Sequence, residues 1–177
     1  MNRIRTIIGI IGILTMAGLM TTYAGAEYVT APEGLRVRSE PNTESKILRV
    51  LSFAEEVSGT VKDGWMKIEE GYVKAEYLSE ENPMDDFEYA GSWLTTAYTH
   101  TGYACANGQY PQAGYTIATN SLSMGTEVYI SGIGFRTVCD RGPGSMPDAW
   151  LDIFMDGYGE CVQYGAQYRD VFIVKHK

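Results

Sequence analysis

Residues 136–155 decide the fold of the second half of the chain, and they read Arg136-Thr-Val-Cys-Asp-Arg-Gly-Pro-Gly-Ser-Met-Pro-Asp-Ala-Trp-Leu-Asp-Ile-Phe-Met155. The first four of these residues form a short, β-prone segment. Residues 141–147 contain two glycines and two prolines, which are typical of a loop, and residues 149–155 return to bulky apolar side chains. The pattern predicts a strand, a loop and a second strand.

This strand–loop–strand unit contains three carboxylates. Asp140 ends the first strand, Asp148 closes the loop and Asp152 lies inside the second strand. Period-two alternation places Asp152 on one face between Trp150 and Phe154. Burial among rings, and a second carboxylate nearby, both raise the pKa of a carboxyl group, as a general acid requires. An aspartate beside a Gly/Pro loop can also be a turn residue that binds local backbone amides.

The first 26 residues of the 177 resemble an export signal. Arg3 and Arg5 give a basic start, residues 7–20 form a largely apolar run, and Ala24-Gly25-Ala26 fits a small-x-small cleavage site. The run is short for a membrane span, which needs about 20 residues. We therefore expect a secreted protein associated with the cell wall, with no membrane attachment after cleavage.

The remaining chain is acidic. The net charge is −8 for the whole sequence, and loss of the two leader arginines makes it −10. An acidic surface repels nucleic acid and anionic polymers, so we expect no nucleic-acid partner and favour a neutral or zwitterionic one. We also expect a monomer without a cofactor.

The sequence has three cysteines, Cys105, Cys139 and Cys161, and export would place them in an oxidising environment. One disulfide and one leftover thiol is the simplest outcome outside the cytoplasm. We favour a pair between Cys105 and Cys161, because Cys139 lies within an apparent strand and suits a buried thiol. No Cys/His spacing resembles a zinc site, so no metal is expected.

Residues 27–78 contain several short apolar runs between turn signals, which predict a small all-β barrel. The runs are residues 34–38, 46–51, 57–61, 64–68 and 71–73. The motifs Gly34-Leu-Arg-Val-Arg-Ser-Glu-Pro41, Ser45-Lys-Ile-Leu48, Gly64-Trp-Met-Lys-Ile68 and Gly71-Tyr-Val-Lys74 resemble a bacterial SH3 (SH3b) module.

This resemblance implies a non-catalytic unit that binds cell-wall peptidoglycan. Trp65 is then either a core aromatic or a wall of the binding groove. Arg36 and Arg38 either contact the ligand or lie solvated on the outer face of a strand.

Residues 79–89 are rich in acids and contain a proline, so they predict an extended acidic linker between two domains. A calcium site is an alternative reading, but the regular spacing of oxygen ligands is absent. From residue 90 to 177 the chain again predicts β-strands, with one short helix over residues 157–166.

The second domain resembles the three-aspartate (3D) domain, which is related to the barrels of membrane-bound lytic transglycosylase A and of stationary-phase survival proteins. The resemblance rests on several motifs in order: Thr96-Ala-Tyr98 with Thr101-Gly102, Tyr115-Thr-Ile-Ala-Thr-Asn120, Met124-Gly-Thr-Glu-Val-Tyr-Ile130, Cys139-Asp-Arg-Gly142, Leu151-Asp-Ile-Phe-Met155, and Tyr164-Gly165 followed by Val171-Phe-Ile-Val174. It implies a double-psi β-barrel. The expected fold is therefore mainly β, an SH3-like small barrel followed by a double-psi β-barrel.

The resemblance also assigns site residues. The family's catalytic aspartate maps onto Asp152 and a second one onto Asp140, whereas the first of the three falls on Asn120, which keeps the hydrogen-bonding shape but lacks the charge. Asp148 has no counterpart in the family, and its role stays open. We expect Asn120, Thr101, Tyr98, Asp148 and Tyr129 to bind substrate, although barrel packing or plain exposure also suits each tyrosine.

The implied activity is that of a peptidoglycan lytic transglycosylase. Such an enzyme cleaves the bond between N-acetylmuramic acid and N-acetylglucosamine, with one aspartate as acid and then base, and leaves a 1,6-anhydro product. The partners would be glycan strands and stem peptides. Two alternatives remain: an expansin-like binding protein without turnover, and a hydrolase in which Asp140 or Asp148 activates water.

Overall fold

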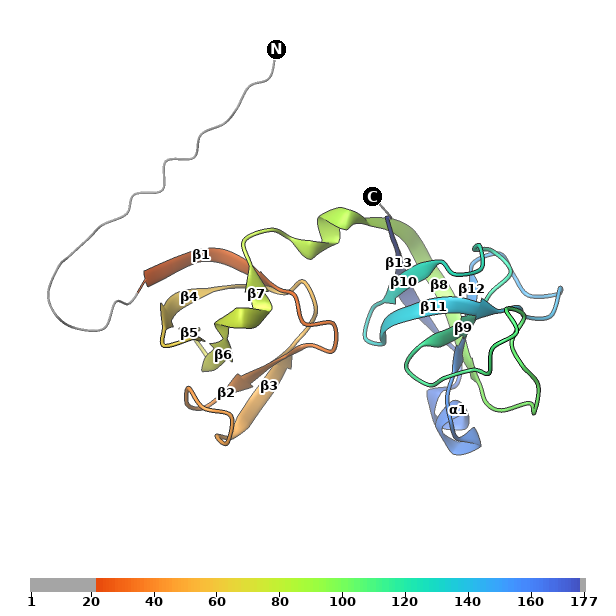
Figure 1. The fold of residues 1–177 in the computed structure, drawn as a ribbon, viewed down its shortest axis with the longest axis horizontal. Helices are drawn as coiled ribbons and strands as arrows, with labels where there is room; N and C mark the ends of the chain where they lie inside the picture. Colours follow the sequence, from red (N-terminus) through yellow and green to blue (C-terminus); the bar gives the residue numbers. More distant parts are fainter. Residues whose placement is uncertain (1–21, 176–177) are drawn as a thin grey trace, which may run out of the picture.

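The computed structural model of this chain describes residues 22–175, which form two β units (Figure 1). The expectation of a mainly β protein is confirmed. The first unit is a seven-stranded sheet, and the second is a closed six-stranded barrel. No helix of the described residues is long and apolar enough to cross a membrane.

The N-terminal sheet has the strand order β3-β2-β6-β5-β4-β1-β7. Its strands are β1 (Thr22–Val29), β2 (Leu35–Arg38), β3 (Ile47–Leu51), β4 (Glu56–Lys62), β5 (Trp65–Lys67), β6 (Tyr72–Lys74) and β7 (Leu78–Ser79), with a 3₁₀ turn η1 (Ala75–Tyr77) before β7. The five runs expected from the sequence correspond to β2 to β6. Asp63 and Gly64 both have positive φ and make the two-residue turn between β4 and β5, a geometry that matches the twist of antiparallel strands.

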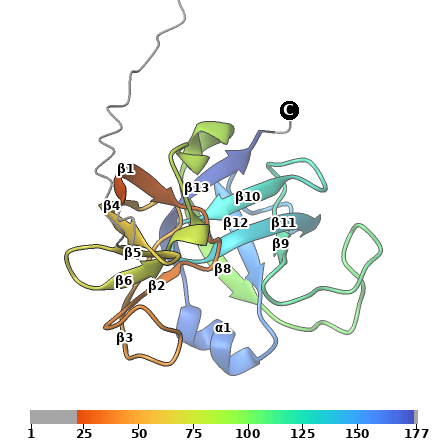
Figure 2. The same cartoon turned by 60° about the vertical axis from the view of Figure 1, so that its left-hand side comes forward.

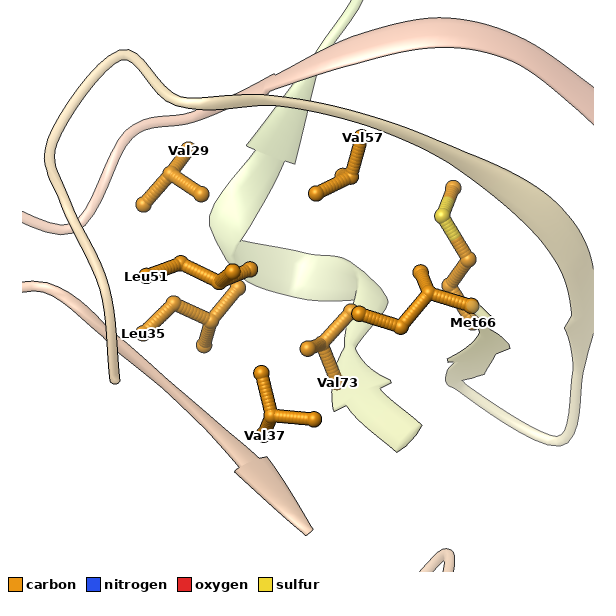
Figure 3. Packing of buried hydrophobic residues seen from close by; sticks show 8 residues of the cluster. Val29, Leu35, Val37, Leu51, Val57, Met66 and Val73 are labelled. Carbon is orange, nitrogen blue, oxygen red and sulfur yellow. The ribbon is translucent and has the colours of Figure 1, made fainter. Parts of the chain in front are cut away.

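Alternation builds the core of this sheet. In β2, Leu35 and Val37 point inward and Arg36 points to solvent. Figure 3 shows the inward side chains converging from several strands. The cluster comprises Val29, Leu35, Val37, Leu51, Val57, Met66, Ile68 and Val73.

Strand β1 begins inside the segment assigned to the leader. Residues 1–21 of that segment lie outside the described residues, but Thr22 pairs with Val61 and Ala24 with Gly59. The register shifts after Ala24, and Glu27 resumes the pairing opposite Val57. A cut after Ala26 would therefore remove five of the eight residues of β1 and keep the last three. Export itself stays a prediction.

The acidic segment 79–89 is more ordered than an extended linker. It begins in β7, continues in the 3₁₀ helix η2 (Pro83–Asp86) and enters β8 at Phe87. The Asn82 side chain accepts a hydrogen bond from the backbone N–H of Met84 at 2.9 Å and so caps η2. An Asn-Pro cap thus outweighs the charge pattern that favoured an extended chain.

The barrel closes in the order β10-β11-β9-β12-β8-β13. Its elements are β8 (Phe87–Tyr98), β9 (Thr116–Ala118), β10 (Glu127–Ile130), β11 (Gly134–Asp140), β12 (Trp150–Phe154), α1 (Tyr158–Tyr164) and β13 (Gln167–Val174). Two pairs are parallel, β8 with β12 and β9 with β11, and the other pairs are antiparallel. Helix α1 lies where the sequence predicts it, at one end of the barrel in both views (Figures 1 and 2).

An aromatic cluster joins the two units. Phe53, which follows β3, packs against Phe87, Tyr129 and Phe135 of the barrel unit with ring centroids 5.9, 5.1 and 5.3 Å away. Aromatic rings bury large apolar areas, so this cluster stabilises the contact between sheet and barrel.

Candidate functional site

Strand β12 carries Asp152 on the outside of the barrel. Leu151 and Ile153, its neighbours in sequence, are fully buried in the barrel core, as the alternation predicts. Asp152 is half-buried between the rings of Trp150 and Phe154. Both rings are covered by loops and neighbouring strands, so Asp152 lies in a partly dehydrated surface site.

Asp140 and Asp152 lie on opposite sides of one small residue. Asp140 of β11 is paired with Ala118 of β9, and Asp152 of β12 is paired with the same alanine from the other side. Two strand spacings put their Cα atoms roughly 10 Å apart. Ala118 is itself buried, and its pairing with both strands sets the distance between the two carboxylates.

The Asp152 carboxylate belongs to a short hydrogen-bond chain. Thr96, which lies opposite Asp152 in the parallel pair β8–β12, donates from Oγ1 to Oδ1 of Asp152 at 2.6 Å. Trp150 donates from Nε1 to the same Thr96 oxygen at 3.0 Å. Burial raises the pKa of Asp152 above its ordinary value, the Thr96 hydrogen bond opposes this, and the charge of Asp140 raises it further.

Asp140 is an acceptor for several donors. The backbone N–H groups of Ala106 and Arg141 donate to Oδ1 at 2.9 and 2.8 Å, and the Tyr98 hydroxyl donates to Oδ2 at 3.4 Å. Burial first, and then the charge of Asp140, raise the pKa of Tyr98. Tyr98 therefore keeps its proton and remains a hydrogen-bond donor beside the two aspartates, as a substrate-binding role requires.

The side chain of Asn120 is hydrogen-bonded to the loop that follows β11. Its Oδ1 accepts from the N–H of Gly142 at 3.2 Å, and its Nδ2 donates to the carbonyls of Gly142 and Pro143 at 3.3 and 3.0 Å. The amide thus holds the loop that follows β11. An aspartate at this position could not donate to either carbonyl.

Asn120→Asp is therefore expected to loosen this loop, although it restores the residue type of the resembled family. A carboxylate would face two carbonyl oxygens, and the loss of hydrogen bonds to the loop costs about 1–3 kcal/mol. Thermal unfolding at pH 7 measures the effect. Asn107→Asp is a control in another loop, and equal or higher stability of Asn120→Asp would contradict the structural role.

Two of the expected substrate residues lie on exposed loops. Thr101 accepts from the N–H of Tyr103 at 3.4 Å, and the carbonyl of Asp148 accepts from the Ser121 hydroxyl. Among the hydrogen bonds of residues 22–175, none joins the side chain of Thr101 or Asp148 to Asp152. Their binding roles stay predictions.

Tyr129 is placed elsewhere, and its assignment to the sugar cleft is corrected. Its ring is 8% exposed and packs between Phe53 and Phe135 in the aromatic cluster, on β10. Strand β10 is separated from β12 by β11 and β9 on one side and by β13 and β8 on the other. Tyr129 therefore packs in the barrel unit. This is one of the alternatives that the sequence left open for each tyrosine.

The expected disulfide between Cys105 and Cys161 is not formed, because all three cysteines are free thiols in the structure. Cys105 precedes Ala106 and Asn107, whose N–H groups bind Asp140 and the carbonyl of Cys139, so it lies beside the end of β11. Cys161 lies on α1. The two cysteines are thus held by different elements, a loop packed on β11 and a helix at the barrel end.

A groove of about 690 Å³ lies on the N-terminal sheet, and we call it the N-terminal groove. Trp65 lines it with an almost buried ring, and Lys74 lies 5.3 Å from the centre of that ring. Arg36 and Arg38 add two further cations to the lining. Trp65 is therefore both a packed aromatic and a wall of this groove. Glu33 and Glu76 also line the groove, and Lys74 lies 3.6 Å from Glu76, so Arg36 and Arg38 are its other cations.

No group of three or more His, Cys, Asp and Glu side chains in residues 22–175 is arranged to hold a metal ion. The comparisons with known proteins add no assignment: no protein-family model matches the chain, and no curated protein matches it.

Thr96 and the loop contact of Asn120 are the site features that sequence reasoning missed. Thr96 is part of a motif in the sequence, but its place opposite Asp152 depends on the parallel register of β8 and β12. No local pattern specifies that register. Trp150 can donate to Thr96 only because the pairing of β8 with β12 brings the two side chains together.

Proposed function

We propose that this protein is a peptidoglycan lytic transglycosylase that cleaves the glycan strand between N-acetylmuramic acid and N-acetylglucosamine. The observation that carries the proposal is Asp152, a half-buried carboxyl with a raised pKa, held by Thr96 and facing Asp140 across Ala118. A carboxyl group whose pKa is raised by burial is the kind of group that a general acid requires.

In this mechanism Asp152 acts twice. It first gives its proton to the glycosidic oxygen, and the bond from that oxygen to the anomeric carbon breaks to leave an oxocarbenium-like sugar. The resulting carboxylate then takes the proton of the sugar's own 6-hydroxyl, whose oxygen closes onto the anomeric carbon. The products are a free 4-hydroxyl and a 1,6-anhydro ring, and no water is consumed.

Asp140 and Tyr98 act as neighbours of the reacting sugar. The negative charge of Asp140 favours the positive charge that develops at the anomeric carbon. Tyr98, which keeps its proton, offers a hydroxyl beside the same carboxylate. The Asp140–Asp152 pair therefore separates an electrostatic role from an acid–base role.

The finer fold assignments belong to the same proposal. We propose that the closed barrel is a double-psi barrel and that the N-terminal sheet is an SH3-like barrel. The two parallel pairs, β8–β12 and β9–β11, within six closed strands support the first assignment. The seven short strands around one small core support the second.

Product analysis tests the activity. Purified peptidoglycan is incubated with the protein, and the soluble fragments are weighed by mass spectrometry. Release of 1,6-anhydromuropeptides is the expected result, and fragments heavier by one water would assign a hydrolase instead. Binding to the wall polymer without soluble fragments would support a non-catalytic wall-binding protein.

The N-terminal groove is expected to hold the wall polymer while the barrel cleaves it. Arg36 lines the groove and is exposed, so Arg36→Glu should weaken binding to intact peptidoglycan about tenfold, since hydrogen bonds to charged groups contribute about 1.5–3 kcal/mol. Sedimentation with insoluble peptidoglycan measures the binding. Lys46→Glu makes the same charge change at an exposed position outside the groove, and an equal loss in both variants would contradict a groove-specific role.

A further inference from the structure

We propose that Thr96, held by Trp150, is a positioning residue that gives its one hydroxyl hydrogen to Oδ1 of Asp152 and so makes Oδ2 the oxygen that carries and delivers the proton. This inference rests on the proposed acid–base role of Asp152. It concerns which of two otherwise equivalent carboxyl oxygens reacts, and why the carboxyl does not turn.

The direction of the hydrogen-bond chain follows from its first member. The indole Nε1–H of Trp150 can only donate, so the Thr96 oxygen, 3.0 Å away, must accept from it. The hydroxyl has a single hydrogen, and this hydrogen points to Oδ1 of Asp152 at 2.6 Å. The chain therefore runs one way, from Trp150 through Thr96 to Asp152.

The same chain disfavours a proton on Oδ1. A proton there would point at the Thr96 oxygen, which already accepts from Trp150, and the Thr96 hydrogen would then need another acceptor. Within residues 22–175, Thr96 has no other acceptor among its hydrogen bonds, and no donor binds Oδ2 of Asp152. The acid proton is thus placed on Oδ2, the oxygen left available to substrate.

The chain is held rigidly by its surroundings. Trp150 is 2% exposed, and an added Cβ at Gly142 would overlap its ring, which shows how closely the backbone covers it. Thr96 and Asp152 are direct neighbours in the parallel pair of β8 and β12. Two paired strands and a packed indole fix the oxygen of Thr96, which in turn fixes the plane of the carboxyl.

Other titratable groups lie near Asp152. The charge of Asp152 raises the pKa of Tyr98 on β8 and of Cys161 on α1, and Asp140 of β11 acts on Asp152, while β9 contributes the apolar Ala118. Asp140 raises the pKa of Asp152, and the hydrogen bond from Thr96 lowers it. Removal of the Thr96 hydroxyl alone is therefore expected to raise the pKa of Asp152.

The test compares Thr96→Val, which keeps the shape but loses the hydroxyl, with Thr96→Ser, which keeps the hydroxyl. The pKa of Asp152 is followed by carbon-13 NMR of labelled carboxyl groups, and the signal is assigned with Asp152→Asn. Thr96→Val should raise the pKa by about one unit, and Thr96→Ser by a few tenths at most. Trp150→Phe should shift it in the same direction by less, because Thr96 keeps its hydrogen but loses its fixed orientation.

Kinetics give the second readout. A general acid loses activity as the pH rises through its pKa, so the alkaline limb of the kcat profile should move up by about one pH unit in Thr96→Val. Its plateau should fall at least tenfold with little change in KM, because the acid is no longer oriented. Thr99→Val, whose hydroxyl binds the carbonyl of Asp156 instead, is the control and should leave both readouts unchanged.

An unchanged pKa of Asp152 in folded Thr96→Val overturns the inference, and so does a Thr96→Ser variant that behaves like Thr96→Val. A purely structural Thr96 would lower the unfolding temperature without moving either pH readout. If the wild-type protein releases no glycan fragments, the proposed function fails, while the NMR titration still decides whether Thr96 controls the Asp152 carboxyl.

Discussion

Asp152→Asn is expected to abolish the release of soluble muropeptides and leave the protein folded. Asparagine has nearly the same shape and can still accept the Thr96 hydrogen bond at its Oδ1, but it has no proton to give to the glycosidic oxygen. General acid–base catalysis contributes typically 10²–10⁴-fold, so turnover should fall by about 10³ or more. Soluble fragments are quantified by chromatography, and folding is checked by circular dichroism.

The same substitution should stabilise the protein at neutral pH. Burial raises the native pKa of Asp152 above its ordinary value of 3.8, which means that folding favours the protonated form. That contribution is fully present below the ordinary pKa and is lost as the pH rises through the native one. The neutral asparagine avoids the cost of a partly buried charge, so its advantage in unfolding temperature should be largest at neutral pH and should vanish in acid.

Asp63→Asn is the matched control for both effects. Its side chain is exposed in the turn between β4 and β5 of the N-terminal sheet, so activity and stability should stay close to those of the wild type. Loss of activity in Asp148→Asn with an active Asp152→Asn would instead favour a hydrolase that uses Asp148. An Asp152→Asn variant that is inactive because it is unfolded would contradict the stability argument.

Gly142→Ala is expected to damage the site through Trp150. A Cβ at position 142 would overlap Cζ3 and Cη2 of the Trp150 ring, so the indole or the loop must move. Overpacking of this kind costs typically 1–3 kcal/mol. Because the same indole orients Thr96, the displacement should also lower turnover at least tenfold.

Gly144→Ala provides the control two residues further along the same loop. An added Cβ at position 144 meets nothing within 4 Å, so this variant should keep both the stability and the activity of the wild type. Unfolding temperature and fragment release are measured side by side for the two variants. If Gly142→Ala matches Gly144→Ala in both measurements, the packing of Trp150 does not govern the site.

Much of the strand pattern could be predicted because it is local. The alternation around Asp152 places Leu151 and Ile153 in the core and Asp152 outside, and the turn residues Asp63 and Gly64 mark a hairpin. The short helix expected over residues 157–166 corresponds to α1: the Gly157 N–H binds Glu160 at its start, and Gly165 follows its last residue with φ +66°. Each of these features depends on residues within one element or one turn.

The errors came from contacts between distant segments. Tyr129 was assigned to the cleft because its sequence motif gives no sign that Phe53 would pack on it, 76 positions earlier in the chain. The hydrogen bonds of the Asn120 amide to the loop at Gly142 and Pro143 likewise have no signal in the local sequence, and its role in binding substrate stays a prediction. The pairing of Cys105 with Cys161 rests on the place of Cys139 in a strand, which carries no information on which loop covers which strand.

By itself the sequence determined the β class and the division into two units, and its alternation put the Asp152 carboxyl group on the outer face of its strand. The tertiary structure alone decided what surrounds that group: Thr96, 56 positions away from Asp152, Asp140 on the far side of Ala118, and Trp150 behind Thr96. The physical reason is register. Side-chain periodicity says which face of a strand a residue occupies, whereas the neighbour across the sheet depends on how the whole barrel closes.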